Sequence, residues 1–447
     1  MEFALFAAAP YVAALIRFGT EPVDLEIAGE AHQLESAIFS AVLSLAALAM
    51  GLYSRRLRAG SGGLLLRFGI ALLATLVIMA IIFYVVPILF LGRGVLGLSA
   101  VIAFVGFAAM RFAFDRVCDE PFFRRRLLVY GTGRRVTGLL QLRRRSDRGR
   151  FSIVGFLAVR NDPEVIPREL WIESDKSLLE LCEEMLVDEI VVGIDDRRVE
   201  FPIESLLACK MKGIAVTEAI DFFEREAGKI RLEALNSTWI IFGPGFSRSR
   251  LTEAGTRLLD IMGGATLLML SLPIMILITA AIILEDGPFK PILYRQCRVG
   301  RHGRRFQILK FRSMHVDAEI AGSPCWAQKE DPRATRVGKY SRKCRADELP
   351  QLWNVLVGDL SLVGPRPERP EFVEELERDI PYYRERHIVK PGLTGWAQLC
   401  YPYGASERDT REKLQYDLYY VKNRSVFFNL MILMQTAEVV LLGKGGR

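Results

Sequence analysis

The sequence predicts a mixed α/β membrane protein with three parts. We expect an N-terminal domain of four transmembrane helices, a Rossmann-like α/β middle domain, and a C-terminal α/β domain that carries a re-entrant membrane helix. Three observations support this prediction. Hydrophobic residues make up 51% of the 447 residues, which is high for a soluble protein. Long apolar segments fill the beginning of the chain, and short apolar strands alternate with helical patterns after them.

Residues 1–120 are expected to form the membrane domain. Arginines follow its second and fourth apolar segments, whereas acidic residues connect the first two, so the positive-inside rule places both ends of the domain in the cytoplasm. No carboxylate lies in the middle of a segment, which favours an anchor over a transporter. The N-terminus has no basic region and no clear cleavage site, so we expect no signal peptide. The four apolar segments cover about 3–19, 35–53, 64–91 and 94–114.

The middle domain, 121–247, begins with RRLLVYGTGRRVTGLLQ, which is typical of a buried strand, a glycine turn and a helix. Further short apolar strands with helical patterns between them predict a parallel sheet. Gly131 and Gly133 would let the backbone approach a pyrophosphate. Val136 stands where a dinucleotide fingerprint has its third glycine, so a turn that binds nothing remains an equal alternative.

A fifth apolar segment, 257–284, opens the C-terminal domain, 248–447. Basic residues flank both of its ends, which places both ends on the cytoplasmic side. Pro273 interrupts the backbone hydrogen bonds in the middle, where Ser271 could satisfy a freed carbonyl. We therefore expect a re-entrant helix. A full span, the alternative, would put Asp347 on the outer face of the membrane.

Two adjacent carboxylates, Asp347 and Glu348, lie in the stretch SRKCRADELPQLWNVLVGDLSLVGPRPE, residues 341–368. Pro350 is tolerated only in the first turn of a helix, so the carboxylates should lie at the start of a short helix that runs to about Gly358. The positive end of that helix would favour anions and keep a carboxylate ionised. The arginines that bracket the pair are Arg342, Arg345 and Arg366.

Carboxylates and arginines that converge at a helix start suggest phosphoryl transfer with a divalent metal. A capped surface helix with solvated salt bridges is the alternative. The net charge of +7 fits lipid or nucleotide phosphates, and its clusters flank apolar segments, so we expect no nucleic acid partner. The seven cysteines are dispersed without a CxxC pair, which indicates reduced thiols rather than a zinc site.

The stretch RADELPQLWNVLVGDLSLVGPRPE resembles the hallmark of the bacterial sugar transferases, the polyprenyl-phosphate glycosyl-1-phosphate transferases. Three further motifs of that family occur along the chain in the order in which the family has them: FQILKFRSM, RHIVKPGLTGWAQ and KLQYDLYYVKN. The resemblance covers roughly residues 250–447. The layout of the whole chain is similar to that of the large members, which initiate exopolysaccharide assembly at the bacterial inner membrane with the catalytic domain on the cytoplasmic face.

The resemblance implies transfer of a sugar 1-phosphate from a UDP-sugar to undecaprenyl phosphate, with release of UMP. Asp347 would be the nucleophile that forms a covalent phosphosugar intermediate. Glu348 would help to hold Mg²⁺ together with Asp347, or assist proton transfer. Arg342 and Arg366 would hold phosphate oxygens.

Further candidate contacts follow from the same resemblance. Lys310 and Arg312 would face one side of a strand beside the active site, although Arg312 could equally face lipid. Arg386, His387 and Lys390 would contact the donor or the lipid headgroup, although a lone histidine is more often structural. The family pairs Ser directly with Pro in the re-entrant helix, whereas Leu272 separates Ser271 from Pro273 here.

Two other functions remain open from the sequence. Membrane-anchored nucleotide-sugar oxidoreductases and dehydratases also join membrane helices to a Rossmann domain, but no tyrosine here has a lysine four residues later. A non-catalytic nucleotide-sensing scaffold is the other alternative. The sequence leaves the sugar undetermined and makes a homodimer a reasonable hypothesis.

Overall fold

The computed structural model forms two compact units, 1–227 and 228–447. The residues that it describes are 2–18, 22–53, 61–87, 92–118, 124–140, 151–159, 162–195, 201–235, 237–243, 245–246, 249–315, 333–401 and 406–441. The middle domain was predicted to extend to residue 247, but the chain joins the second unit from Gly228 onward. The indole of Trp396 donates a hydrogen bond of 2.8 Å to the carbonyl of Gly228, and Ile230 N donates one of 3.0 Å to the carbonyl of Gln415.

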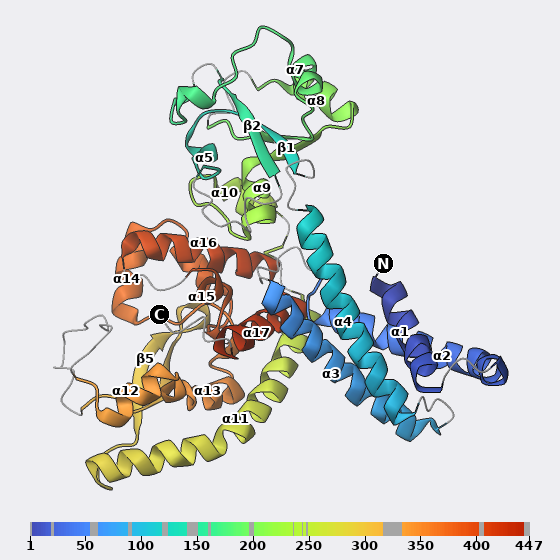
Figure 1. The fold of residues 1–447 in the computed structure, drawn as a ribbon. Helices are drawn as coiled ribbons and strands as arrows, with labels where there is room; N and C mark the ends of the chain where they lie inside the picture. Colours follow the sequence, from blue (N-terminus) through green and yellow to red (C-terminus); the bar gives the residue numbers. More distant parts are fainter. Residues whose placement is uncertain are drawn as a thin grey trace. The chain divides into compact units, whose positions relative to one another are not determined.

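Four helices begin the first unit (Figure 1). Aromatic side chains pack between them. Phe6, Phe39, Phe68 and Phe107 are buried, and the rings of Phe68 and Phe107 stack with their centroids 4.1 Å apart. These rings, together with the aliphatic side chains of the same cluster, supply contacts between the helices. Their bounds are α1 Glu2–Phe18, α2 Pro22–Ala49, α3 Ser61–Val85 and α4 Arg93–Cys118.

Two of these four helices are long and apolar enough to cross a membrane, as judged over the described residues: Gly62–Val85 and Arg93–Phe114. The apolar part of α2 is shorter, Gln33–Leu48, and α1 has only 17 residues. The third such helix in the described chain lies in the second unit. Arg55, Arg56 and Arg58, which follow the second apolar segment, lie outside the described residues.

The α/β part of the first unit is a four-stranded sheet in the order β2-β1-β3-β4, and all its strand pairs are parallel. All four residues of β3 are buried because apolar clusters cover both faces of the sheet. The parallel sheet predicted for this region is thus present. Its elements are β1 Arg125–Tyr130, α5 Arg134–Thr137, β2 Phe151–Leu157, η3 Arg168–Leu170, α7 Leu178–Glu184, β3 Glu189–Val192, α8 Ile203–Met211, β4 Ala215–Glu218 and α9 Ala219–Ala227.

The second unit contains α11, Arg250–Asp286, a helix of 37 residues with Pro273 inside it. Figure 1 shows that α11 bends partway along its length, as expected where a proline removes a backbone hydrogen bond. Pro273 leaves the carbonyl of Met269 without its usual donor, but Ser271 Oγ donates instead to the carbonyl of Leu268, at 3.2 Å. The expectation that Ser271 satisfies the carbonyl freed by Pro273 is therefore wrong.

The remaining elements of the second unit form small sheets wrapped by helices. β5 and β6 form an antiparallel hairpin, and β7 and β8 pair in parallel. The C-terminal helix is packed, since Phe428 and Ile432 are buried. The bounds are α10 Ser237–Phe242, β5 Leu293–Val299, η4 Arg301–Gly303, β6 Arg305–Phe311, α12 Arg336–Lys343, η5 Ala346–Glu348, α13 Gln351–Val357, β7 Ser361–Val363, α14 Pro370–Asp379, η6 Tyr383–Ile388, β8 Gly392–Thr394, α15 Trp396–Cys400, α16 Glu407–Asn423 and α17 Val426–Leu441.

Candidate active site

Asp347 and Glu348 lie in a short 3-10 turn, η5, between α12 and α13. Arg345 introduces this turn in the left-handed region, with φ 54°, which is rare for a residue with a side chain. Pro350 follows and opens α13, and Gly358 ends that helix with φ 105°. The predicted helix is therefore present, but the carboxylates occupy a separate turn that precedes it.

Cations from two other segments converge on Glu348. Arg366 Nη2 lies 2.9 Å from Oε1 of Glu348, and Lys310 Nζ lies 3.4 Å from the same oxygen. Burial alone would raise the pKa of Glu348, but the positive charges of Arg366, Lys310 and Arg345 outweigh burial and lower the pKa to about 2. Glu348 is therefore a permanently ionised group that organises the cations around it.

Asp347 has a different environment, although it is the adjacent residue. It is buried, and no ion pair to its carboxylate is found among the described residues. Burial raises the pKa of Asp347, and the negative charge of Glu348 raises it further, while Lys310 and Arg342 oppose the shift. The expected ionising effect of the helix end therefore does not decide the state of Asp347. Its carboxylate is poorly solvated and is not held by a cation.

Arg366 is held by a second layer of buried groups. Its carbonyl accepts a hydrogen bond of 3.0 Å from Arg386 Nη2. Arg386 itself is buried and lies 2.8 Å from Asp417 Oδ2 and 2.8 Å from the hydroxyl of Tyr383. Arg386 was a candidate for substrate contact, but these bonds direct its guanidinium toward the protein interior. Asp417 lies inside the KLQYDLYYVKN motif, so the sequence marked this residue. The sequence did not indicate that its partner is Arg386.

A further layer comes from the hairpin. Arg298 Nη1, on β5, donates a hydrogen bond of 3.0 Å to the carbonyl of Pro367 and lies 3.5 Å from Glu368. Burial lowers the pKa of Lys310, on β6, and the neighbouring charges of Arg366 and Arg298 add to that effect, whereas Glu348 opposes it. Sequence reasoning did not single out Arg298 for the site.

Three of the candidate residues lie away from the carboxylates. Arg312 follows β6 and lies 2.5 Å from Asp286, at the end of α11. His387 is buried against the ring of Tyr383, with its Nδ1 3.8 Å from Glu377, which is too far for a hydrogen bond. Burial, together with the charges of Arg386 and Arg384, lowers the pKa of His387 to about 3. His387 is therefore a neutral packing residue.

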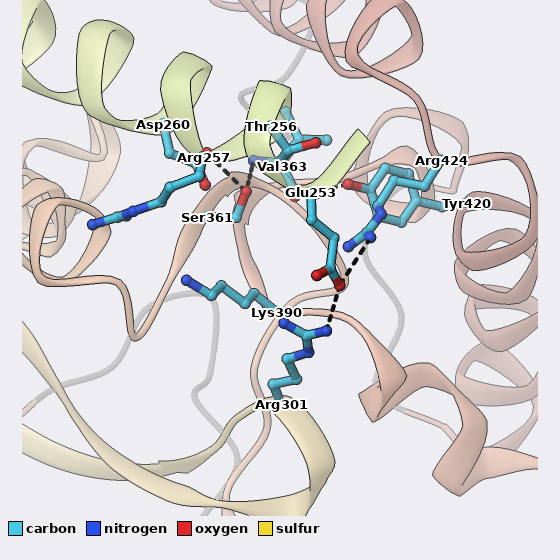
Figure 2. Close-up of a pocket in the computed structure, with 10 residues that line it drawn as sticks. All are labelled: Glu253, Thr256, Arg257, Asp260, Arg301, Ser361, Val363, Lys390, Tyr420 and Arg424. Carbon is cyan, nitrogen blue, oxygen red and sulfur yellow. Dashed lines mark hydrogen bonds and ion pairs between the residues drawn. The ribbon is translucent and has the colours of Figure 1, made fainter. Parts of the chain in front are cut away.

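The third, Lys390, lies in a small, partly open pocket with a cavity volume of about 40 Å³, lined mainly by charged side chains. In Figure 2, Glu253 lies between Arg301 and Arg424, while Asp260 accepts a hydrogen bond from Ser361. The lining residues are Glu253, Thr256, Arg257, Asp260, Arg301, Ser361, Val363, Lys390, Tyr420 and Arg424.

A divalent metal finds few protein ligands near Asp347. No group of three or more His, Cys, Asp or Glu side chains suited to a metal occurs among the described residues. Glu348 is already surrounded by cations, whereas Asp347 is not. The residues fit Mg²⁺ in the mode in which one or two carboxylates bind it and substrate phosphates and water supply the other ligands.

The glycine turn of the middle sheet is the other place where sequence suggested a phosphate. Its amides are already engaged: Thr132 N and Gly133 N each donate a 2.8 Å hydrogen bond to Asp162 Oδ2. The next two amides, of residues 134 and 135, donate to Asp195 at 3.0 and 3.1 Å. A Cβ at Gly133 would lie 2.6 Å from the carboxyl carbon of Asp195. Carboxylates thus fill the position of a pyrophosphate.

Comparison with known proteins places the C-terminal unit. The family model for the bacterial sugar transferases matches residues 251–443. The chain is 39% identical over 261 residues to a UDP-N-acetylgalactosamine-undecaprenyl-phosphate N-acetylgalactosaminephosphotransferase from Aeromonas hydrophila; the match covers 58% of this chain and 60% of that protein.

Two further relatives carry other sugars in their names. A UDP-glucose:undecaprenyl-phosphate glucose-1-phosphate transferase from Caulobacter vibrioides is 41% identical over 41% of this chain and 69% of its own length. An undecaprenyl-phosphate galactose phosphotransferase from Salmonella typhimurium is 38% identical over 42% of this chain and 41% of its own. All three matches, like the family model, run beyond the motif at 341–368 alone. The chain belongs to the bacterial sugar transferase family.

Proposed function

We propose that this protein transfers a sugar 1-phosphate from a UDP-sugar to undecaprenyl phosphate, forming undecaprenyl-diphospho-sugar and UMP. The observation that carries the proposal is the environment of the carboxylate pair. Asp347 is buried and has no ion pair with any residue that the structure describes, while the adjacent Glu348 holds Lys310 and Arg366 in place. The names of the relatives, which all refer to undecaprenyl phosphate and a sugar phosphate, support the same reaction.

The first half of the proposed reaction uses Asp347 as the nucleophile. One of its carboxylate oxygens attacks the β-phosphorus of the donor, and the bond from that phosphorus to the bridging oxygen breaks, so that UMP leaves with the bonding electrons. A carboxylate that few charges stabilise is a stronger nucleophile than one held in ion pairs. Asp347 fits this role better than Glu348, whose pKa is lowered to about 2.

In the second half, a phosphate oxygen of the lipid attacks the same phosphorus, and the bond to Asp347 breaks. The aspartate is restored and the lipid diphosphate leaves. Lys310 and Arg366 would stabilise the phosphate oxygens as charge builds up on them. With so low a pKa, Glu348 is a poor proton acceptor at neutral pH, so we assign it the placement of the two cations. Bound Mg²⁺, held by Asp347 and by Glu348 if its cations shift, would neutralise the diphosphate.

The membrane placement belongs to the same proposal. The acceptor is a lipid and the donor is soluble, so a helix that enters one leaflet and returns would bring both to Asp347. We place the protein in the bacterial inner membrane with this unit on the cytoplasmic face. The length of α11, 37 residues, and its bend near the middle support a re-entrant path over a straight span.

Release of UMP by the purified full-length protein is the test. The assay contains undecaprenyl phosphate, Mg²⁺ and a panel of UDP-sugars, with Asp347→Asn alongside. Lipid-dependent UMP from one donor, lost in the variant, is the expected result and also identifies the sugar. A nucleotide sensor or an oxidoreductase would release no UMP from any donor, and that result under conditions where a related transferase works would overturn the proposal.

A further inference from the structure

We propose that the pocket around Lys390 is a second phosphate-binding site, separate from Asp347, and that it takes the phosphate of a membrane lipid headgroup. The pocket has four cationic side chains and two anionic ones: Arg257, Arg301, Lys390 and Arg424 against Glu253 and Asp260. An excess of positive charge in a pocket suits an anion. The inference does not depend on the proposed reaction.

Both carboxylates in the pocket are already engaged. Asp260 Oδ1 accepts hydrogen bonds of 2.8 Å from Ser361 Oγ and 2.9 Å from Leu362 N, so it serves to hold β7. Glu253 Oε1 lies 2.5 Å from Arg301 and 3.7 Å from Arg424, so one carboxylate serves two guanidinium groups (Figure 2). Neither of them forms an ion pair with Lys390 among the described residues, although Asp260 and Asp359 act on its charge from a longer distance.

Lys390 and Arg257 approach the same point. The amino nitrogen of Lys390 lies 3.3 Å, and Nη2 of Arg257 lies 3.4 Å, from the position that a Cβ on Gly358 would take. Arg257 also donates hydrogen bonds of 2.7 and 2.6 Å to the carbonyls of Val355 and Leu356, which fixes its guanidinium. Two cations so close repel each other, and Asp260, which acts on both without an ion pair to either, offsets only part of this repulsion.

Within the described parts of the chain, the amino group of Lys390 has no hydrogen bond or ion pair. Burial lowers the pKa of Lys390, and the charges of Arg257 and Arg301 add to this effect, while Asp260 opposes it. A bound phosphate would supply the missing charge and accept hydrogen bonds from Lys390. Charge-assisted bonds of this kind are among the stronger ones in proteins.

The position of the pocket on α11 indicates a lipid as the source of the phosphate. Glu253, Arg257 and Asp260 share one face of the first turns of this helix, because they are spaced by four and three residues. Directly after them the exposed side chains become apolar, with Met262 62% and Met269 79% exposed. A pocket at the junction of a charged end and an exposed apolar helix lies where headgroup phosphates are found.

The pocket is distinct from the carboxylate site because α13 separates the two. Glu348 lies just before α13, and Gly358 lies just after it. A Cβ on Gly358 would lie 3.3 Å from Lys390 and 3.4 Å from Arg257. Seven helical residues extend about 10 Å. The two phosphates of one diphosphate share a bridging oxygen and cannot reach both ends. A phosphate at Lys390 is therefore not the one that reacts at Asp347.

Native mass spectrometry of the full-length protein in detergent tests the proposal. The two probes are phosphatidylglycerol and inorganic phosphate, added separately. The variants are Lys390→Met, which keeps the length but removes the charge, Lys390→Arg, which restores a charge, and the matched control Lys212→Met on the exposed end of α8. We expect the affinity for phosphatidylglycerol to fall about tenfold in Lys390→Met, to recover in part in Lys390→Arg, and to stay unchanged in the control.

Each outcome decides the question. Lys390-dependent binding of inorganic phosphate without binding of the lipid would support a phosphate site and overturn the lipid as its source. Lipid binding that is equal in all four proteins would overturn the site. Misfolding is not a concern for the variant: without ligand, Lys390→Met should melt at the same temperature as the wild type or higher, because it removes an uncompensated charge.

Discussion

Arg366 Nη2 lies 2.9 Å from Glu348 Oε1, while no cation in the described part of the chain forms an ion pair with Asp347, the residue just before Glu348. Pro365 and Pro367 restrict the loop on both sides of Arg366. Arg386 donates a hydrogen bond to the carbonyl of Arg366. The structure thus gives two adjacent carboxylates opposite environments. One fixes the positive charges of the site and the other is left available for reaction.

Replacing the proposed nucleophile should abolish turnover without unfolding the protein. For Asp347→Asn we expect lipid-dependent UMP release to fall at least about a thousandfold, because the amide cannot form the acyl phosphate. The melting temperature should not fall, since Asp347 is a buried carboxylate with a raised pKa and no ion pair. Retained UMP release in this variant would exclude a covalent intermediate on Asp347.

Replacing the neighbouring carboxylate, Glu348, should mainly lower the stability of the protein, whereas replacing Asp347 should mainly lower its activity. Glu348→Gln leaves Lys310 and Arg366 without their common partner, and we expect a loss of about 3 kcal/mol in the free energy of unfolding. Adding Lys310→Met should restore part of that loss, because the stranded charge is gone. Denaturant unfolding measures both changes.

The exposed ion pair between Glu374 and Arg305 supplies the matched control for this prediction. Its side chains are 69% and 65% exposed, so Glu374→Gln should cost less than about 1 kcal/mol. Equal losses for Glu348→Gln and Glu374→Gln would contradict the view that the Glu348 cluster is a buried, coupled network.

The stability of the second unit should depend on pH through His387. Its pKa is lowered to about 3 in the folded state from an ordinary 6.5. The unfolded chain therefore binds a proton below pH 6.5 that the folded chain does not, so stability is fully present above that pH and is lost as the pH falls. The expected loss at pH 5 is about 2 kcal/mol.

Thermal unfolding at pH 7.5 and pH 5 of the wild type and His387→Gln tests this dependence. The variant should lose the part of the pH effect that His387 contributes. His315→Gln, which changes an exposed histidine, is the matched control and should behave as the wild type. A variant of His387 as acid-sensitive as the wild type would show that the imidazole is protonated in the fold.

The path of α11 can be measured by labelling. In a cysteine-free background, Arg250→Cys and Lys290→Cys lie on the two sides of the apolar stretch. We expect a membrane-impermeant maleimide to label both from the cytoplasmic side of the membrane, in inverted vesicles, and neither in intact cells. Labelling of the two positions from opposite sides would establish a full span.

Pro273→Ala is the informative variant for the same assay. Without the proline, a straight helix of 37 residues would be about 55 Å long, well beyond the ~30 Å of a bilayer core. We expect the position at 290 to lose its cytoplasmic labelling in part of the molecules. Ser271→Ala should change little, because the hydroxyl bonds to Leu268 rather than to the carbonyl that the proline frees.

Local sequence was sufficient for the carboxylate site and insufficient for its surroundings. The expected convergence of arginines on the carboxylates is seen for Arg366 and Glu348, whose side chains lie 2.9 Å apart. Arg386 and Lys390 are only four residues apart, yet one supports Arg366 from the interior and the other enters a different pocket. The ion-pair partner of Arg386, Asp417, and the cation next to Lys390, Arg257, come from distant helices, and no single-sequence pattern reports such contacts.

The same limit applies to the glycine turn. The stretch GTGRR suggested a turn whose backbone amides could reach a pyrophosphate. The turn is present, but its amides donate hydrogen bonds to carboxylates that lie about thirty and sixty residues further along the chain. Asp162 follows β2 and Asp195 follows β3, so both come from strands next to β1. Parallel pairing brings the ends of neighbouring strands together, and only the fold shows which side chains meet there.

The arrangement of Asp162 at this turn means that the middle sheet carries its own tethered competitor for any nucleotide. A group attached to the same chain acts at an effective concentration in the millimolar range or above, and it needs no diffusion to return. A free pyrophosphate would have to displace two such groups together, at the cost of four backbone hydrogen bonds. The turn therefore behaves as a closed structural joint, and its glycines serve the close approach of Asp195 instead of a cofactor.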